Sequence, residues 1–350
     1  MRRRTFGLGM AAMTVASQAR AADMRSLSVN YGVPQIPIST APIFSVPRRL
    51  GLWPEAGLDV TPQGAQGAGP ALQQLIAGQV MLTFTGLPAA MELINKGAPI
   101  KVVASVYGRN VFYPVVLANS PITEIAGLKG KTIGVTGIAS TNAQWIRAIL
   151  RSYNVADDDI HLVATGDGAS ALSALQHGQV DALQLVEADY DRFETTGVSL
   201  RRLNAAPVLQ KLSFVQGLVA HTKTIASDPK LLNGLLRGIA GASFYCQARP
   251  EDGVRMHWAE YPETKPQGDS EKALAAGTLV LKNQISAYTV ATDKRFGVTT
   301  QAKVELVRDT LADLGQLSKR LPAESYFTDA FIDAANDFDM AAMLARKPNL

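Results

Sequence analysis

The chain has 350 residues, of which 47% are hydrophobic and 18% are charged, so it is long enough for two domains with buried apolar cores. Four of its 34 basic residues (Arg2, Arg3, Arg4 and Arg20) precede residue 22, where no acidic residue occurs, which leaves 30 basic residues against 30 acidic ones. This balance gives no reason to expect nucleic acid or anionic lipid as partners, and the single cysteine, Cys246, excludes an intramolecular disulfide.

Residues 1–21 have the features of a secretory signal peptide. A cluster of arginines precedes a weakly apolar run over 6–16, which is far too short to span a membrane, and Ala19-Arg20-Ala21 supplies the small-x-small pattern of a signal peptidase site. The paired arginines resemble a twin-arginine (Tat) export motif, and an ordinary Sec signal explains them equally well. We therefore expect a soluble protein exported to the periplasm, with its mature N-terminus at Ala22 or Asp23.

From residue 27 onward, short apolar runs alternate with segments of helical periodicity. This alternation predicts an α/β fold in which mainly parallel sheets are flanked by helices. The first predicted strands cover 27–31, 58–62, 80–84 and 100–106, with helices over 43–50, 70–77 and 89–95. A second series has strands over 132–135, 160–164 and 181–185, with helices over 142–153 and 169–177.

An internal repeat favours two similarly built lobes. The pattern Ala-Leu-x-x-Leu-x-x-Gly-Gln-Val occurs at 71–80 and again at 171–180, where a helix ends at a glycine and a strand follows. The alternative is a chance match, since this succession is common in α/β proteins. We predict that lobe 1 comprises 25–112 and 218–350 and that lobe 2 comprises 113–217. The chain then crosses between lobes near 108–114 and 213–219, which are the expected hinges.

Beyond residue 227 the alternation stops and helical patterns dominate. Asp228 and Pro229 are typical of a helix start, and apolar residues at helical spacing over 303–314 end at Gly315. We expect this helical C-terminal tail to return to lobe 1 and pack against it.

Signatures of enzyme chemistry are not visible in the sequence. The four histidines (His161, His177, His221 and His257) are scattered without metal-ligand spacing, so we expect no metal and no cofactor. The glycines over 127–132 precede a strand instead of following one, which favours a turn over a phosphate-binding loop. No Gly-x-Ser-x-Gly nucleophile elbow occurs. The sequence therefore predicts a protein that is not an enzyme.

The features that remain suit non-covalent binding at strand ends, where open α/β sheets place their ligands. The segment 138–142 leads from a strand into a helix, and its free N–H groups and hydroxyls favour an anionic group, although Ser140 or Thr141 could simply cap the helix. Residues 83–88 follow another strand. Four further side chains could contact a ligand or belong to the core or surface: Tyr31, Tyr107, Tyr113 and Arg109.

A series of short motifs gives the chain a family resemblance. It resembles the substrate-binding proteins of ABC importers for nitrate, taurine and aliphatic sulfonates, which share the type II periplasmic binding fold with thiamine-pyrimidine carriers. The resemblance implies a periplasmic protein that captures a small organic anion, of sulfonate or carboxylate type, by hinge closure. It also implies membrane permease subunits as partners and a monomer. The motifs lie at 51–53, 57–60, 75–78, 86–88, 97–100, 125–135, 139–142 and 175–182.

The resemblance also implies which loops contact the ligand. The chain departs from the family pattern at Met81 and at the Val186-Glu187-Ala188 segment, and the second departure, which lies in the expected pocket, puts a specific taurine or sulfonate ligand in doubt. The implied contact residues, to which Tyr107 is added from its position near a strand end, are Val33, Pro34 and Gln35; Gly64, Ala65 and Gln66; Thr85, Gly86 and Leu87; Ser140, Thr141 and Asn142; and Val186 and Glu187.

The main alternative is an enzyme on the same fold, similar to thiamine-pyrimidine synthases. Those enzymes resemble one another in a cysteine-rich segment, which a chain with Cys246 alone cannot contain. The sensor portion of a signalling receptor is a third reading, and the sequence shows no apolar run long enough for the membrane helix that such a receptor needs.

Overall fold

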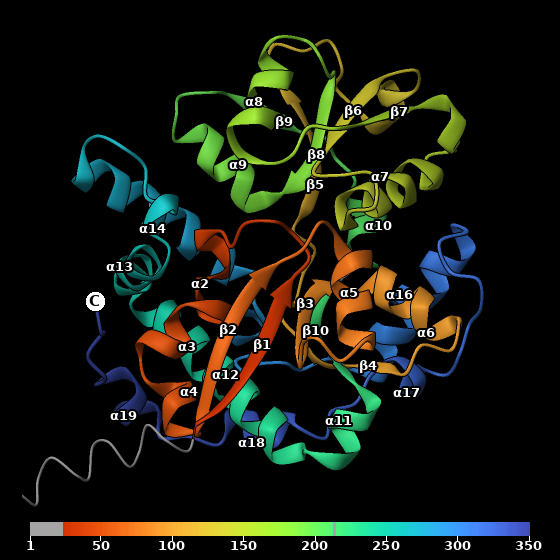
Figure 1. Ribbon diagram of the computed structural model, residues 1–350. Coiled ribbons are helices and arrows are strands. Elements are labelled where there is room, and N and C mark those ends of the chain that lie inside the picture. Colours follow the sequence, from red (N-terminus) through yellow and green to blue (C-terminus); the bar gives the residue numbers. More distant parts are fainter. Residues whose placement is uncertain (1–23, 213–214) are drawn as a thin grey trace, which may run out of the picture.

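The computed structural model describes residues 24–212 and 215–350, and it contains two five-stranded sheets flanked by helices (Figure 1). The predicted α/β fold with two lobes and a helical C-terminal region is therefore confirmed. The predicted signal peptide, residues 1–21, lies outside the described residues. In the two described ranges no helix is both long and apolar enough to cross a membrane.

The sheet of lobe 1 has the strand order β2-β1-β3-β10-β4. β1 pairs in parallel with β2 and β3, whereas β10 is antiparallel to both β3 and β4, so four strands share one direction and one opposes them. The sheet is thus mixed rather than simply parallel, because β10 enters it on the return from lobe 2. The strands are β1 Arg25–Tyr31, β2 Leu58–Gly64, β3 Leu82–Gly86, β4 Ile100–Ser105 and β10 Gln216–His221.

The sheet of lobe 2 repeats this arrangement with the order β7-β6-β8-β5-β9. β6 is parallel to β7 and β8, and β5 is antiparallel to β8 and β9. In each sheet the reversed strand is the first one after the chain enters that lobe from the other. The strands are β5 Phe112–Leu117, β6 Thr132–Val135, β7 His161–Ala164, β8 Ala182–Val186 and β9 Leu200–Arg202.

The chain crosses between the sheets twice, from β4 to β5 and from β9 to β10. Phe112 already pairs in the lobe 2 sheet, and Gln216 already pairs in the lobe 1 sheet. The exact residues at which one lobe ends and the other begins stay a prediction, as do the hinge positions.

Helices cover both sheets. The predicted helix over 43–50 is wrong as a single element, because Pro47 has no N–H for the Ile43 carbonyl and its ring clashes with that carbonyl, so the chain makes several short turns instead. Lobe 1 has η1 Ile38–Thr40, α2 Ala41–Phe44, α3 Val46–Arg49, α4 Leu52–Glu55, α5 Ala68–Ile76 and α6 Leu87–Asn95. Lobe 2 has η2 Ile125–Leu128, α7 Thr141–Ser152, η3 Asp157–Asp159, α8 Gly168–Gln176, α9 Glu187–Glu194 and α10 Ala206–Leu209.

The C-terminal tail completes lobe 1, as expected. Its longest helix, α12, packs so closely on the Trp53 ring that a Cβ on Gly238 would lie 2.5 Å from it, and the Trp53 indole N–H donates to the Leu235 carbonyl at 3.2 Å. The helices are α11 Thr222–Ser227, α12 Pro229–Ala248, α13 Pro250–Glu260, η4 Pro262–Thr264, α14 Ser270–Ser286, α15 Thr289–Thr292, α16 Gln301–Asp313, α17 Ala323–Tyr326, α18 Ile332–Asn336 and α19 Met340–Leu344.

An aromatic cluster links this tail to the carboxyl edge of the lobe 1 sheet, where β1 and β3 end. The Tyr31 ring stacks on Phe84 with centroids 5.1 Å apart, and Phe84 packs near Tyr107. Tyr107 meets Tyr288 of the tail edge to face at 5.1 Å. All four rings are buried. The core therefore extends up to the end of β1 and holds Tyr31 in one position there.

Candidate ligand-binding cleft

The carboxyl ends of β1 and β3 face those of β6 and β8, and the loops that follow these strands enclose one pocket between the lobes. Parallel strands of one sheet end at the same edge, which is where α/β proteins place their ligands. Figure 1 shows this junction between the yellow-green lobe and the red-orange lobe. With the lobes in contact the pocket is small, with a cavity volume of about 30 Å³, so a solute larger than one or two water molecules requires the lobes to move apart. Its lining is Tyr31, Gly32, Val33, Pro37, Thr85, Gly86, Phe112, Thr136, Ser140, Thr141, Asn142, Asp167, Val186, Asp189 and Gln216.

Seven of the predicted contact residues come together in this lining, although they lie in four separate stretches of the chain. Lobe 1 supplies three of them and lobe 2 supplies four. Whether they contact a ligand stays a prediction. These residues are Val33, Thr85, Gly86, Ser140, Thr141, Asn142 and Val186.

The other predicted contact residues lie outside the lining. Pro34, Gln35 and Gln66 are exposed, and Gly64 is so close to Pro34 that a Cβ would lie 2.0 Å from its carbonyl oxygen. Strand β2 therefore continues to Gly64 beside the loop instead of turning into the cleft. The remaining four are partnered or buried elsewhere: Ala65, whose N–H donates to Tyr31; Leu87, whose N–H donates to Val215; Tyr107; and Glu187.

Tyr107 and Glu187 have clear partners of their own. The Tyr107 hydroxyl accepts a hydrogen bond from Gln284 within the lobe 1 core. Glu187 forms an ion pair with Arg109, with a Nη1 to Oε2 distance of 2.8 Å. Arg109 therefore does not offer a free positive charge to an anion, because its guanidinium is already matched by a lobe 2 carboxylate. Tyr113 also contacts this guanidinium at 3.4 Å and lies outside the cleft lining.

The start of helix α7 brings the two lobes into contact. The Ser140 hydroxyl accepts from the Ala143 N–H at 3.3 Å, so Ser140 is the N-cap. The Thr141 side chain presses against Gly86 of lobe 1, where a Cβ would lie 2.2 Å from Thr141 Oγ1. Only a glycine at position 86 leaves room for this approach. The capping alternative is thus the one observed for Ser140, whereas Thr141 lies at the interface between lobes.

Four polar residues of the lining, Thr136, Asp167, Asp189 and Gln216, were not predicted from the sequence. The repeat offered a signal for one of them. Asp167 stands one hundred residues after Gly67, at the matching position before helix α8, so the repeat places it at the same edge of its sheet. Gln216 follows the second crossing, and no sequence pattern showed that β10 would insert beside β3.

Asp189 is the most buried acid of the cleft, with 7% of its surface exposed. Burial raises the pKa of its carboxyl to about 6, the Arg192 guanidinium at 2.8 Å lowers it, and the nearby charge of Asp167 raises it further. Burial also raises the pKa of Tyr31 far above its ordinary value, and the negative charges of Asp189 and Asp167 add to this rise. The charge of Asp167 therefore acts on both Asp189 and Tyr31, which places the three groups near one another at the cleft.

Two further polar atoms of the lining lack partners. Thr85 Oγ1 and Gln216 Oε1 make no hydrogen bond to any described residue, although Thr85 is 1% and Gln216 is 5% exposed. Buried polar atoms are normally paired, so unpaired ones mark a place that a ligand or water completes. The described lining also offers hydroxyl, amide and carboxylate groups but neither a thiol nor an imidazole.

The one cysteine and the one buried histidine both lie in the helical region of lobe 1. Cys246 is fully buried on α12, and burial raises the pKa of its thiol. His257 is buried on α13, where its Nδ1 lies 3.1 Å from the Ser45 hydroxyl and burial lowers its pKa to about 3. Across the described residues no group of three or more His, Cys, Asp or Glu side chains is arranged to hold a metal ion.

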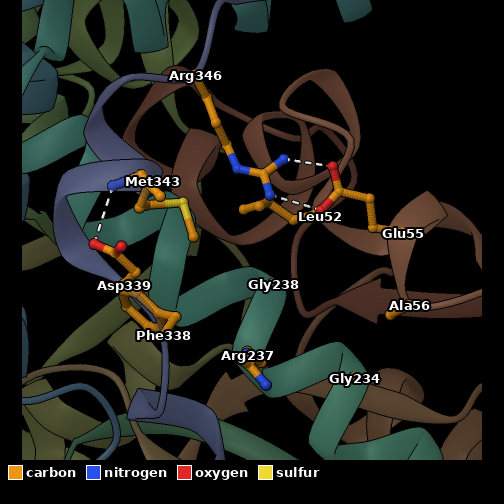
Figure 2. Close-up of a pocket in the computed structure, with 11 residues that line it drawn as sticks. Leu52, Glu55, Ala56, Gly234, Arg237, Gly238, Phe338, Asp339, Met343 and Arg346 are labelled. Carbon is orange, nitrogen blue, oxygen red and sulfur yellow. Dashed lines mark hydrogen bonds and ion pairs between the residues drawn. The ribbon is translucent and has the colours of Figure 1, made fainter.

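A second pocket lies on lobe 1 between α4, α12 and α19, away from the cleft (Figure 2). Arg346 of the tail makes a two-pronged ion pair with Glu55, with both N to O distances at 2.6 Å. Asp339 caps α19 by accepting from the Ala341 N–H at 2.8 Å. These contacts connect the tail to α4 and give Glu55, Asp339 and Arg346 structural roles in this pocket.

Comparisons with known proteins agree with this architecture. A Haemophilus influenzae protein whose name refers to thiamine biosynthesis is 25% identical over 205 residues, which are 57% of this chain and 62% of that protein. The chain therefore spans less than two thirds of that relative.

Solved structures show the fold more completely. A Bordetella bronchiseptica protein superposes with a TM-score of 0.69 at 20% identity, covering 90% of this chain and 98% of that one. The alkanesulfonate-binding protein of Xanthomonas axonopodis pv. citri, bound to MOPS, gives 0.65 at 15% identity, covering 86% and 98%. A desulfurization enzyme gives 0.56 at 13% identity, covering 88% and 98%. The same fold thus carries both binding proteins and an enzyme.

The predicted resemblance to periplasmic sulfonate-binding proteins is confirmed at the level of the fold by these structures. A model of the family described as NMT1/THI5 like matches residues 41–253, which is well over half of the chain and includes most of the cleft lining. The chain therefore belongs to the NMT1/THI5-like family.

Proposed function

We propose that this protein is the solute-binding component of an ABC importer, which captures a small organic solute between its two lobes and releases it to membrane permease subunits. The observation that carries the proposal is the pocket itself. It is built from both lobes, and unpartnered buried polar atoms point to a ligand that completes it.

Closure by hinge motion accounts for the contacts across the cleft. Gly86 and Thr141 touch, and Gly67 of lobe 1 also approaches Ala139 of lobe 2. The chain joins the lobes by only two crossings, an arrangement that permits domain closure around a ligand. The ligand contacts proposed here are six of the predicted residues of the lining, joined by Asp167, Asp189 and Gln216, whereas the Ser140 side chain caps helix α7.

The setting of this function follows from the sequence. A secretory signal over residues 1–21, read by either the Tat or the Sec route, would place the mature protein in the periplasm, where such receptors meet their permease. The proposed receptor acts as a monomer. Its structural relatives include the alkanesulfonate-binding protein, which agrees with a receptor role by fold.

The expected charge of the ligand needs separate consideration. An organic sulfonate or carboxylate has support from the N-terminus of α7 at the cleft, since helix N-termini favour anions. The described lining, however, contains no lysine, arginine or histidine, and it includes Asp167 and Asp189. The proposed function therefore names a small organic solute and does not require it to carry a sulfonate or carboxylate group. The anionic ligand stays a prediction that the charges of the lining do not favour.

An enzyme similar to thiamine-pyrimidine synthases has one observation in its favour, which is the name of the Haemophilus influenzae relative. The lining that the structure describes provides no thiol for such chemistry, because the single cysteine, Cys246, is buried on α12. A receptor that binds its solute unchanged fits these groups better.

The test combines binding with product analysis. The purified mature protein is screened by thermal unfolding against small organic anions, cations and neutral compounds. At a concentration 100 times the Kd, one-site binding adds about 2.7 kcal/mol, which at roughly 2–4 °C per kcal/mol raises Tm by about 5–11 °C. Each compound that raises Tm is then incubated with the protein and analysed by mass spectrometry. Steady conversion of any of them into product would overturn the receptor role.

A further inference from the structure

The cleft carries an excess of negative charge on its lobe 2 side. Asp189 pairs with Arg192 through a Nη2 to Oδ1 distance of 2.8 Å, and its carboxylate also accepts a backbone hydrogen bond from Val186. Asp167 has neither an ion-pair partner nor a side-chain hydrogen bond among the described residues, and it raises the pKa of Asp189 through its own charge. Arg192 balances the charge of Asp189, so the Asp167 carboxylate leaves one negative charge without an ion-pair partner at the pocket.

The lobe 1 side of the cleft adds one hydrogen-bond acceptor, Gln216 Oε1, and one hydroxyl, that of Thr85, which can donate or accept. The Gln216 side chain forms a hydrogen bond with the Tyr31 hydroxyl through its amide N–H, while its Oε1 atom accepts none from the described residues. Thr85 Oγ1 is likewise without a partner. A buried acceptor without a donor costs free energy, so a ligand that brings N–H groups gains where a ligand that brings only acceptors loses.

The remaining walls of the cleft are apolar. Val33, Pro37 and Val186 present carbon surfaces, and the ring of Phe112 lines the pocket while it stacks on Trp145 at a centroid distance of 6.4 Å. Such a site takes a compact carbon body and fixes its orientation through a few polar groups.

We propose that the cleft selects a solute with a protonated amine or amidinium group on a compact apolar body, with the cation between Asp167 and Asp189 and its N–H groups directed at Gln216. The inference rests on the proposed function and names its substrate class. An anion in the same position would face two carboxylates with no lysine, arginine or histidine in the described lining, and burying a charge without a partner is unfavourable.

The experiment uses three probes that share a phenyl ring and differ in their polar group. Benzylamine, benzyl alcohol and benzenesulfonate are titrated calorimetrically into the mature protein near neutral pH. The same titrations are made with Asp167→Asn and Asp189→Asn, which keep the side-chain shape and remove the charge. Asp158→Asn serves as the matched control, because Asp158 is an exposed acid of the same lobe that lies outside the cleft lining. Circular dichroism checks that each variant is folded.

We expect benzylamine to bind most tightly and benzenesulfonate least. Hydrogen bonds to charged groups are strong enough that each cleft variant should weaken benzylamine by roughly 10- to 150-fold. Benzyl alcohol should change little in either variant, and the control should bind all three probes like the parent.

The outcomes separate this inference from the receptor role. Three results would each overturn the cationic substrate class: tighter binding of benzenesulfonate than of benzylamine, no detectable binding of benzylamine, or benzylamine binding that is unchanged in both cleft variants. Binding of the neutral or anionic probe in those cases would leave the receptor role standing. Chemical conversion of a bound probe, followed by mass spectrometry, would instead refute the receptor role.

Discussion

Strand β3 (Leu82–Gly86) of lobe 1 and strand β8 (Ala182–Val186) of lobe 2 lie one hundred residues apart, and each ends at the cleft. The helices before them, α5 and α8, keep the same offset, and the strand orders of the two sheets correspond position by position. The residues that follow the strands differ. Lobe 1 continues with an apolar start to α6, whereas lobe 2 continues with Glu187 and the buried Asp189.

The difference shows how one scaffold can supply two kinds of surface. In lobe 1 the strand end gives a hydroxyl, Thr85, and a glycine that admits the other lobe. In lobe 2 the same end leads to a carboxylate. Shared backbone geometry therefore fixes where the cleft lies, and the few residues beyond each strand decide what the cleft can bind.

The largest expected effect comes from the two lobes' opposite responses to acid. The pKa of Asp189 is raised from 3.8 to about 6, so its stabilising contribution is complete below pH 4 and is lost as the pH rises through 6. The pKa of His257 is lowered from 6.5 to about 3, so its contribution is present above 6.5 and is lost as the pH falls toward 3. Each change amounts to about 3 kcal/mol between pH 7 and 4, with opposite sign.

Urea unfolding at pH 4 to 7 of Asp189→Asn and His257→Gln tests this contrast. The first variant should lose more stability on acidification than the parent, and the second should lose less. Arg192, Asp167 and Tyr31 surround Asp189, so Asp158→Asn is the control for a general charge effect. Parallel pH curves for parent and variants would contradict the opposite responses.

A smaller effect is expected where the lobes touch. Gly86→Ala keeps an ordinary backbone (φ −67°, ψ 129°), but its Cβ would lie 2.2 Å from Thr141 Oγ1. Overpacking of this kind costs about 1–3 kcal/mol. Here it raises the free energy of the closed state relative to the open state, so it should weaken ligand binding by roughly 5- to 150-fold. Calorimetry with a ligand found in the screen measures the loss.

Two variants sharpen this test of closure. Gly69→Ala is the matched control, because a Cβ on Gly69 meets no atom within 4 Å. Thr141→Gly removes the obstructing side chain together with its proposed ligand contact, so adding Gly86→Ala to Thr141→Gly should cost little further affinity. Unchanged affinity in Gly86→Ala would show that the lobes need not meet at Thr141 when the ligand is bound.

The smallest expected effect separates capping from ligand binding at α7. Ser140→Ala removes the acceptor of the Ala143 N–H and should cost about 1 kcal/mol of stability, with affinity nearly unchanged. Thr141→Ala should instead lower the affinity for ligand. The lobe 1 cap Thr300, which accepts from the Lys303 N–H at 3.2 Å, gives the control Thr300→Ala, with a similar loss of stability and no loss of affinity. A tenfold loss of affinity in Ser140→Ala alone would reverse the assignment of these two residues.

Much of the fold could be read from local patterns. The alternation of strand and helix, the strand over 132–135, and the helix start at Asp228 and Pro229 all occur as predicted, with most other boundaries shifted by one or two residues. These features depend on neighbours in the chain, through hydrophobic period, caps and glycine stops. The failure over 43–50 has a local cause as well, because Pro47 interrupts a pattern that is otherwise helical.

The sequence by itself determined the two-lobe α/β scaffold, its repeat, and the strand ends at which a cleft should form. Only the tertiary structure decided which side chains meet there. Gln216 reaches the cleft because β10 inserts beside β3. Arg109 offers no free positive charge to a ligand because it forms an ion pair with Glu187 of the other lobe. Both results depend on residues far apart in the chain, whose pairing follows from packing and burial and leaves no periodic trace in the sequence.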